Sequence, residues 1–164
     1  MTAATEVAAH GSAPTHCKVS ANISLHLNLE LRLLRQCEGK FYYGGVGGCK
    51  GAIPSVSNGN STALQQGYAT ARSDIWHTGN SFWQISHGLT LTLQTYLVLH
   101  QCPRWHHRLT VVVWAVYEKV FEKSYFKGCS NGGSGALITA ICNPNLFDGI
   151  VVRTSAHNWV GLLG

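Results

Sequence analysis

Ser130 stands between Gly128 and Gly132 in the stretch YFKGCSNGGSGA, which covers residues 125–136. An apolar, aromatic segment precedes the serine, and helix-forming residues follow it as far as Pro144, which a helix interior does not tolerate. The five residues GCSNG, 128–132, fit the pattern G-x-S-x-G of a nucleophile elbow. In such an elbow a sharp strand-to-helix turn holds the serine in a strained backbone conformation, and the glycines leave it room. The sequence therefore predicts a strand, a tight turn at Ser130 and a helix over residues 131–142.

The rest of the chain alternates between patterns typical of strands and of helices. Apolar residues occupy every second position of ISLHLNLELRL, residues 23–33, which predicts one strand, buried on one side, in an antiparallel part or near the edge of a sheet. The alternation of strands with helices along the chain indicates an α/β fold with an antiparallel amino-terminal strand and parallel strands between helices. The further predicted elements are an aromatic strand from residue 40, a short helix over 61–67, a strand over 68–74, a helix on the stripe Leu109, Val112, Val113, Val116 and Val120, and strands over 124–127 and 149–155.

Composition narrows the class of protein further. The chain has 164 residues, of which 45% are hydrophobic and 12% charged, so we expect one globular domain. Its net charge of +5 comes from scattered Lys and Arg, which does not predict a nucleic-acid partner, and no apolar run is long enough to cross a membrane. Sequons at Asn22 and Asn60 favour a secreted or periplasmic location, although the first residues show no signal-peptide pattern.

Four blocks of the chain resemble the tannase and feruloyl esterase family of α/β-hydrolases, and they occur in the family's order. The resemblance implies a partial α/β-hydrolase sheet within a single, incomplete catalytic domain over residues 1–164. It also implies a serine esterase that acts on small phenolic esters of gallic or hydroxycinnamic acids. No cofactor is expected in this chain, because the family's calcium site belongs to a lid domain beyond it. The blocks are HCKVSANI, GKFYYGGVGGCKGAI, ALQQGYATARSDIWHTGNS and the stretch from KSYFKGCSNGGSG to NWVGLL.

By this resemblance Ser130 is the attacking serine, and the glycine-rich loop over residues 44–51 shapes the oxyanion hole. The backbone N–H groups of Gly47, Gly48 and Asn131 would then hold the negative charge.

The resemblance also pairs Cys129 in a disulfide with a cysteine beside the catalytic histidine, which the family carries beyond this chain. Within the chain, Cys142 lies about 18 Å away by helical rise, and Cys49 in the glycine-rich loop is the nearest substitute. We therefore expect Cys129 to be a free thiol here.

The acid and the base of a serine hydrolase have no clear source in this chain. Asp148 and His157 follow Ser130 in the right order, but the helix before Asp148 carries the chain about 18 Å back to the opposite edge of the sheet. Asp74 and His77 follow a strand at the ligand-binding edge, where they are expected to brace a loop. Two interpretations stay open: a serine esterase, or a noncatalytic fragment that keeps the elbow as a structural turn.

Residues 100–107 and residues 82–104 are the parts of the sequence that are hardest to interpret. HQCPRWHH, residues 100–107, offers imidazole and thiol groups, but its spacing matches no common zinc site. We expect exposed histidines on a linker there, and no metal site. Departures from the family pattern include Ser134 in place of an arginine and a poor match over residues 82–104.

Overall fold

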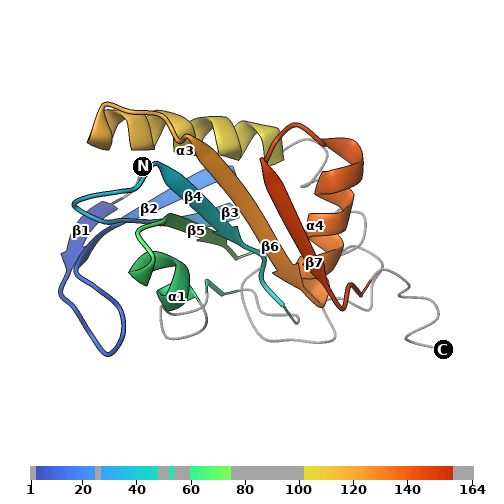
Figure 1. Cartoon of the computed structure of the whole chain (residues 1–164), viewed down its shortest axis with the longest axis horizontal. Helices are drawn as coiled ribbons and strands as arrows, with labels where there is room; N and C mark the ends of the chain where they lie inside the picture. Colours follow the sequence, from blue (N-terminus) through green and yellow to red (C-terminus); the bar gives the residue numbers. More distant parts are fainter. Residues whose placement is uncertain (1–2, 25–26, 48–51, 54–59, 75–101, 157–164) are drawn as a thin grey trace.

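The computed structural model describes residues 3–24, 27–47, 52–53, 60–74 and 102–156 (Figure 1). Within these ranges the chain forms a mixed sheet of seven strands in the order β1-β2-β3-β5-β4-β6-β7. The strands are β1 (Ala3–Val7), β2 (His16–Ser24), β3 (Leu27–Leu33), β4 (Lys40–Gly44), β5 (Ala69–Ser73), β6 (Lys123–Cys129) and β7 (Gly149–Arg153), and the helices are α1 (Asn60–Gln65), α3 (Cys102–Tyr117) and α4 (Asn131–Cys142).

The amino-terminal half of the sheet is antiparallel, as the sequence predicts, but the single strand predicted over residues 23–33 is wrong. The chain reverses between Ser24 and Leu27, which pair with each other across β2 and β3, and β1 adds a strand that the sequence analysis did not predict. Apolar and polar residues alternate in the sequence on both sides of the reversal, because every second side chain of each strand faces the same core. Periodicity alone therefore could not mark the turn.

The carboxyl-terminal half of the sheet is parallel. Strand β4 pairs in parallel with both β5 and β6, and β7 pairs in parallel with β6. From β4 the chain passes through α1 to β5, whereas from β6 it passes through α4 to β7 in the opposite direction along the sheet. Right-handed crossovers then put α1 and α4 on opposite faces, as Figure 1 shows. The chain thus has a topological switch point between β4 and β6, and crevices at such points bind ligands in α/β proteins.

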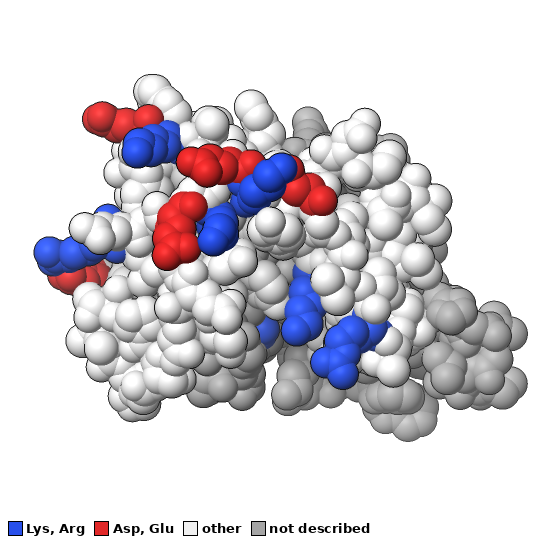
Figure 2. All heavy atoms as spheres, viewed as in Figure 1, with Lys and Arg blue, Asp and Glu red and all other residues white. Residues whose placement is uncertain are grey.

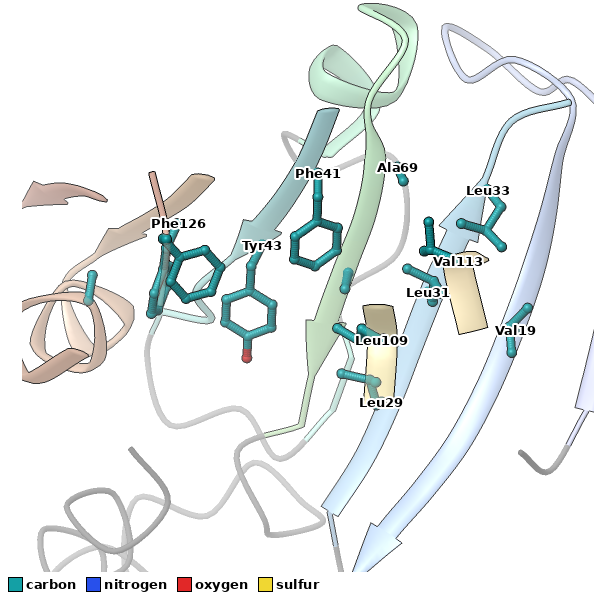
Figure 3. Close-up of a cluster of buried hydrophobic side chains, with 13 residues drawn as sticks. Val19, Leu29, Leu31, Leu33, Phe41, Tyr43, Ala69, Leu109, Val113 and Phe126 are labelled. Carbon is teal, nitrogen blue, oxygen red and sulfur yellow. The ribbon is translucent and has the colours of Figure 1, made fainter. Parts of the chain in front are cut away.

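Helix α3 covers the same face of the sheet as α4 and completes the main core. Leu109 and Val113 are 2% exposed and pack against the buried leucines of β3. Figure 3 shows the rings of Phe41, Tyr43 and Phe126 beside these aliphatic side chains. The Tyr43 and Phe126 rings meet edge to face at 4.9 Å between centroids, an arrangement that aromatic pairs favour.

Two sequence predictions on α3 are wrong. The expected linker over residues 100–107 is helical from Cys102, and the half-buried His106 contacts the rings of Phe41 and Phe147, whereas His107 is exposed as expected. Burial lowers the pKa of His106. The predicted apolar stripe also includes two residues that are exposed, Val116 and Val120. The last residue of the helix that packs against the core is Tyr117. A helix turns about 100° per residue, so residues 106, 109, 113 and 117 share that face.

Charges of both signs lie close together on the molecular surface. Figure 2 shows Lys and Arg beside Asp and Glu over the upper part of the viewed face. Two ion pairs of the described residues join Lys40 to Glu38 and Arg35 to Glu6, each with 3.2 Å between nitrogen and oxygen. Within the described residues, no helix combines the length and apolar character needed to cross a membrane.

Asp148 lies at the amino end of β6, at the edge of the sheet opposite Ser130. Its carboxylate accepts hydrogen bonds from the Ser124 backbone N–H at 2.8 Å, the Ser124 hydroxyl at 3.0 Å and the Lys123 ammonium at 2.9 Å. These donors, Lys123 first, lower the pKa of Asp148 to about 2. This confirms the expectation that Asp148 cannot orient a histidine beside Ser130, and it gives the carboxylate a structural role.

The low pKa of Asp148 predicts a stability difference that depends on pH. Because the folded-state pKa of about 2 lies below the ordinary value of 3.8, the unfolded chain binds a proton first as the solution is acidified. The contribution of Asp148 to folding is therefore fully present above pH 4 to 5 and is lost as the pH falls toward 2. We expect Asp148→Asn to lower the urea midpoint at neutral pH and to converge with wild type in acid.

The matched control is Glu118→Gln, since Glu118 is an exposed carboxylate with no hydrogen bond or ion pair among the described residues. That variant should follow wild type throughout the titration. Parallel curves for Asp148→Asn and wild type would show that Asp148 does not stabilise this end of β6.

Candidate active site

Ser130 sits at a sharp turn between β6 and α4. Its backbone has φ 55° and ψ −122°, and residues other than glycine rarely adopt such a positive φ. The residue is exposed to solvent. The strand before it ends at Cys129 and the helix after it begins at Asn131. The predicted strand, strained turn and helix are confirmed.

Glycines allow the backbone segments around Ser130 to approach one another closely. A Cβ on Gly128 would lie 1.9 Å from the carbonyl oxygen of Gly132, so only glycine fits at residue 128. A Cβ on Gly132 would lie 2.7 Å from the carbonyl carbon of Gly45, in the loop after β4. The Gly45 N–H donates to the Lys127 carbonyl at 2.9 Å and fixes this loop against β6. The elbow thus closes on itself and on the neighbouring strand's loop.

The same loop brings Gly47 against the serine. A Cβ on Gly47 would lie 3.4 Å from the Cys129 carbonyl oxygen and 3.9 Å from the Ser130 Cβ. Asn131, the first residue of α4, is 5% exposed and follows the serine directly. Two of the three residues expected at an oxyanion hole therefore flank Ser130, whereas Gly48 lies outside the described residues.

The segment after β7 holds the elbow from its other side, a contact that the sequence analysis missed. The Ser130 N–H donates to the Arg153 carbonyl, and the Ala156 N–H donates to the Ser130 carbonyl, both at 3.1 Å. Below the elbow the hydroxyls of Ser155 and Ser134 are 3.4 Å apart. Backbone contacts of this kind leave no residue-type signal, since any residue supplies an N–H and a carbonyl.

Cys129 is an exposed free thiol, as expected. Its Sγ lies 3.2 Å from the hydroxyl of Thr154, and the other cysteines with described side chains, Cys17, Cys37 and Cys142, are also free. Cys49 lies outside the described residues.

Asp74 has the bracing position that the sequence suggests. It follows β5 and is 2% exposed, and its carboxylate accepts hydrogen bonds from the Asn28 backbone N–H at 3.0 Å and the Asn28 amide at 2.6 Å. These bonds tie the end of β5 to the start of β3, and β4 separates both strands from the elbow. His77 and His157 lie outside the described residues.

The sheet is mixed, has helices on both faces and carries a strained serine on the strand-to-helix turn at the switch point. Together these features define a protein of the α/β-hydrolase fold. Comparison with known families agrees. Residues 11–163 match the family described as tannase and feruloyl esterase, and the chain belongs to that family.

Individual relatives give the same result. The chain is 31% identical over 148 residues to a probable feruloyl esterase B-2 of Aspergillus fumigatus and 30% identical over 148 residues to a probable feruloyl esterase B-1 of Aspergillus flavus. Each match covers 88% of this chain and 27% of the relative, so the chain spans about a quarter of their length.

Solved structures resemble the chain over nearly all of its length. An esterase from Aspergillus oryzae superimposes with a TM-score of 0.75 at 27% identity, over 94% of this chain and 31% of that one. Feruloyl esterase B from Aspergillus oryzae gives a TM-score of 0.77 at 24% identity, over 98% of this chain and 35% of that one, which supports the fold.

The packing at the elbow predicts opposite effects for two glycine substitutions. Gly128→Ala should reduce the free energy of unfolding by roughly 3 kcal/mol or more, because its methyl group would overlap a backbone carbonyl that cannot move independently. Gly135→Ala should leave stability unchanged or raise it by up to ~1 kcal/mol, since alanine suits a helix interior better than glycine. At residue 135 the nearest atom, in the Phe126 ring, would lie 4.0 Å from the new Cβ.

Urea unfolding followed by circular dichroism measures both effects. Equal stabilities for the two variants would contradict the close approach of Gly128 to Gly132.

Proposed function

We propose that this chain carries the nucleophile region of a carboxylic-ester hydrolase of the tannase and feruloyl esterase type, with Ser130 as the nucleophile. The observation that carries the proposal is the strained, exposed serine with Gly47 against it at the carboxyl edge of the parallel strands. The relatives support it, since they are named as probable feruloyl esterases. The substrate class proposed is small phenolic esters, of gallic or hydroxycinnamic acids.

In the proposed mechanism the Ser130 hydroxyl attacks the ester carbonyl carbon, and the carbonyl oxygen becomes an oxyanion. The backbone N–H groups of Gly47, Gly48 and Asn131 would stabilise that charge. Asn131 suits this role because the first N–H groups of a helix have no acceptor within the helix, and the helix amino terminus carries a partial positive charge. The alcohol then leaves with a proton, and water attacks the acyl-enzyme to release the acid and restore the serine. No step requires a cofactor in this chain.

The described residues do not include a general base beside Ser130. Within the described ranges no histidine contacts Ser130, Asp74 accepts hydrogen bonds from Asn28, and Asp148 lies at the opposite edge of the sheet. Without a base and an orienting acid, a serine hydrolase typically loses ~10⁴-fold or more of its rate. We therefore expect acylation of Ser130 by activated esters, with feeble turnover of unactivated ones.

The alternative is a noncatalytic protein that keeps the elbow as a structural turn. The tight glycine packing would serve such a turn as well as it serves an enzyme, so stability alone does not separate the two. The reactivity of Ser130 toward esters separates the two interpretations.

The test exposes the chain to 4-nitrophenyl esters of acetic and ferulic acids and follows the protein by intact and peptide mass spectrometry. We expect one acyl group, located on Ser130, and no adduct on Ser130→Ala. Ser20→Ala is the matched control, because Ser20 lies in β2 in the antiparallel half of the sheet. That variant should acylate like wild type.

The absence of a Ser130-dependent adduct would favour the noncatalytic alternative. Rapid turnover of methyl ferulate or methyl gallate that Ser130→Ala abolishes would confirm the esterase and show that the chain contains its own base. His157 and His77 would then be the residues to substitute.

A further inference from the structure

The segment after β7 has one more residue beside Ser130 than a regular parallel ladder contains. The Ser130 N–H donates to the Arg153 carbonyl, and the Ser130 carbonyl accepts from the Ala156 N–H. In a regular strand the backbone groups that face one neighbour recur at every second residue, so the donor after Arg153 would be residue 155. The donor is residue 156 instead. Thr154 and Ser155 therefore form a β-bulge next to the elbow.

The backbone of Thr154 shows how the chain accommodates the extra residue. Its φ of 39° is positive, and a β-branched residue is an outlier there. Among the described residues other than glycine, a positive φ occurs at two further positions, Ser130 in the elbow and Glu118 after α3. Two of these three strained residues directly follow the paired ends of β6 and β7. Such strain persists where the surrounding structure fixes it, and it clusters at functional sites.

Contacts on two sides fix the bulge. Toward β6, the Thr154 hydroxyl lies 3.2 Å from the Cys129 Sγ. Toward α4, the first turn of the helix comes so close that a Cβ on Gly133 would lie 2.7 Å from the Arg153 carbonyl oxygen and 3.1 Å from the Ser155 Cα. The bulge therefore packs against both of the elements that the elbow joins.

We propose that Thr154 is a positioning residue for Ser130 and acts through its backbone. Because Ser130 leaves its strand at a positive φ, its carbonyl does not lie where a regular ladder places the next acceptor. The extra residue lets the Ala156 N–H reach that carbonyl, while the Arg153 carbonyl still holds the Ser130 N–H. The peptide groups on both sides of the serine are then fixed from the end of β7. Bulges next to active sites re-aim side chains in this way.

The bulge also sets the direction of an N–H group proposed for the oxyanion hole. The Ser130 carbonyl and the Asn131 N–H belong to one planar peptide unit, so the direction of one fixes the direction of the other. That carbonyl accepts from the Ala156 N–H and from the Ser134 N–H within α4. This role rests on the function proposed for Ser130, since the Asn131 N–H acts on charge that develops in the ester.

Two substitutions at residue 154 test the backbone conformation directly. Proline has φ fixed at about −65°, which excludes the observed bulge, whereas glycine adopts a positive φ without strain. Proline introduces no other conflict with the bonds to Ser130, because the Thr154 N–H takes no part in them. Arg153 ends a strand, and an extended backbone is what the residue before a proline favours.

Hydrogen exchange and acylation give two independent measurements. In Thr154→Pro the amide protons of Ser130 and Ala156 should exchange faster by about tenfold or more, because the bulge that holds them is lost. Acylation of Ser130 by 4-nitrophenyl acetate should slow by about tenfold to a hundredfold, since small displacements of reacting groups have effects of that size. Thr154→Gly should raise the urea midpoint and should slow acylation less than proline does.

The matched control is the same pair of substitutions at Glu118, which has φ 54° and directly follows α3. Glu118→Pro removes the hydrogen bond from the Glu118 N–H to the Trp114 carbonyl and should lower the urea midpoint, whereas Glu118→Gly should raise it. Neither variant should slow the acylation of Ser130, measured without urea where the protein is folded. The control thus separates the geometry of the bulge from stability alone.

The outcomes distinguish this proposal from the proposed function. Wild-type exchange of both amides in Thr154→Pro, or equal slowing of acylation by proline and glycine at residue 154, would overturn the positioning role. A wild type that forms no adduct on Ser130 would refute the proposed function alone. The exchange rates would still decide whether Thr154 holds the serine.

Discussion

The structure depends most on a close approach of backbone to backbone where β4 and β6 end. Gly45, Gly128 and Gly132 meet there at distances that leave no room for a side chain. This contact brings the loop that carries Gly47 against Ser130, where the backbone has a positive φ. The strain at Ser130 persists because three segments determine its position: β6, the loop after β4 and the segment after β7. Fold and candidate site therefore share one set of contacts.

The sequence predicts the parallel half of this fold better than the antiparallel half. A helix between two strands leaves a change of period and a stop signal, and the bounds of α4 agree with those expected from Ser130 and Pro144. A hairpin between two strands of the same period leaves no such change, so the reversal between Ser24 and Leu27 was missed. The charged Arg32 shows a related limit. It lies on the side of β3 expected to face solvent, yet it is 3% exposed and paired with Glu30.

At the site, features marked by particular residue types could be predicted from the sequence, whereas contacts made by backbone groups could not. The elbow at Ser130 could be predicted because its glycines are visible in the sequence, and the bracing position of Asp74 follows from its place after a strand. The segment from Arg153 to Ala156 was missed because it holds the elbow through backbone groups that every residue possesses. The buried place of His106 was missed for a different reason. Its neighbours Phe41 and Phe147 come from distant parts of the chain, and only the folded sheet brings them together.

The two ends of β6 are held by different forces, and this difference bears on the chemistry. Its amino end is anchored by Asp148, a group that titrates, whereas its carboxyl end is held by glycine backbones and amide hydrogen bonds, which do not. Acid therefore acts on the end of the strand that is remote from Ser130 and leaves the contacts of the elbow intact until the sheet itself unfolds. It follows that a pH dependence of acylation at Ser130, within the range where the chain stays folded, would report a titrating group that acts on the serine or on the ester and not the geometry of the turn.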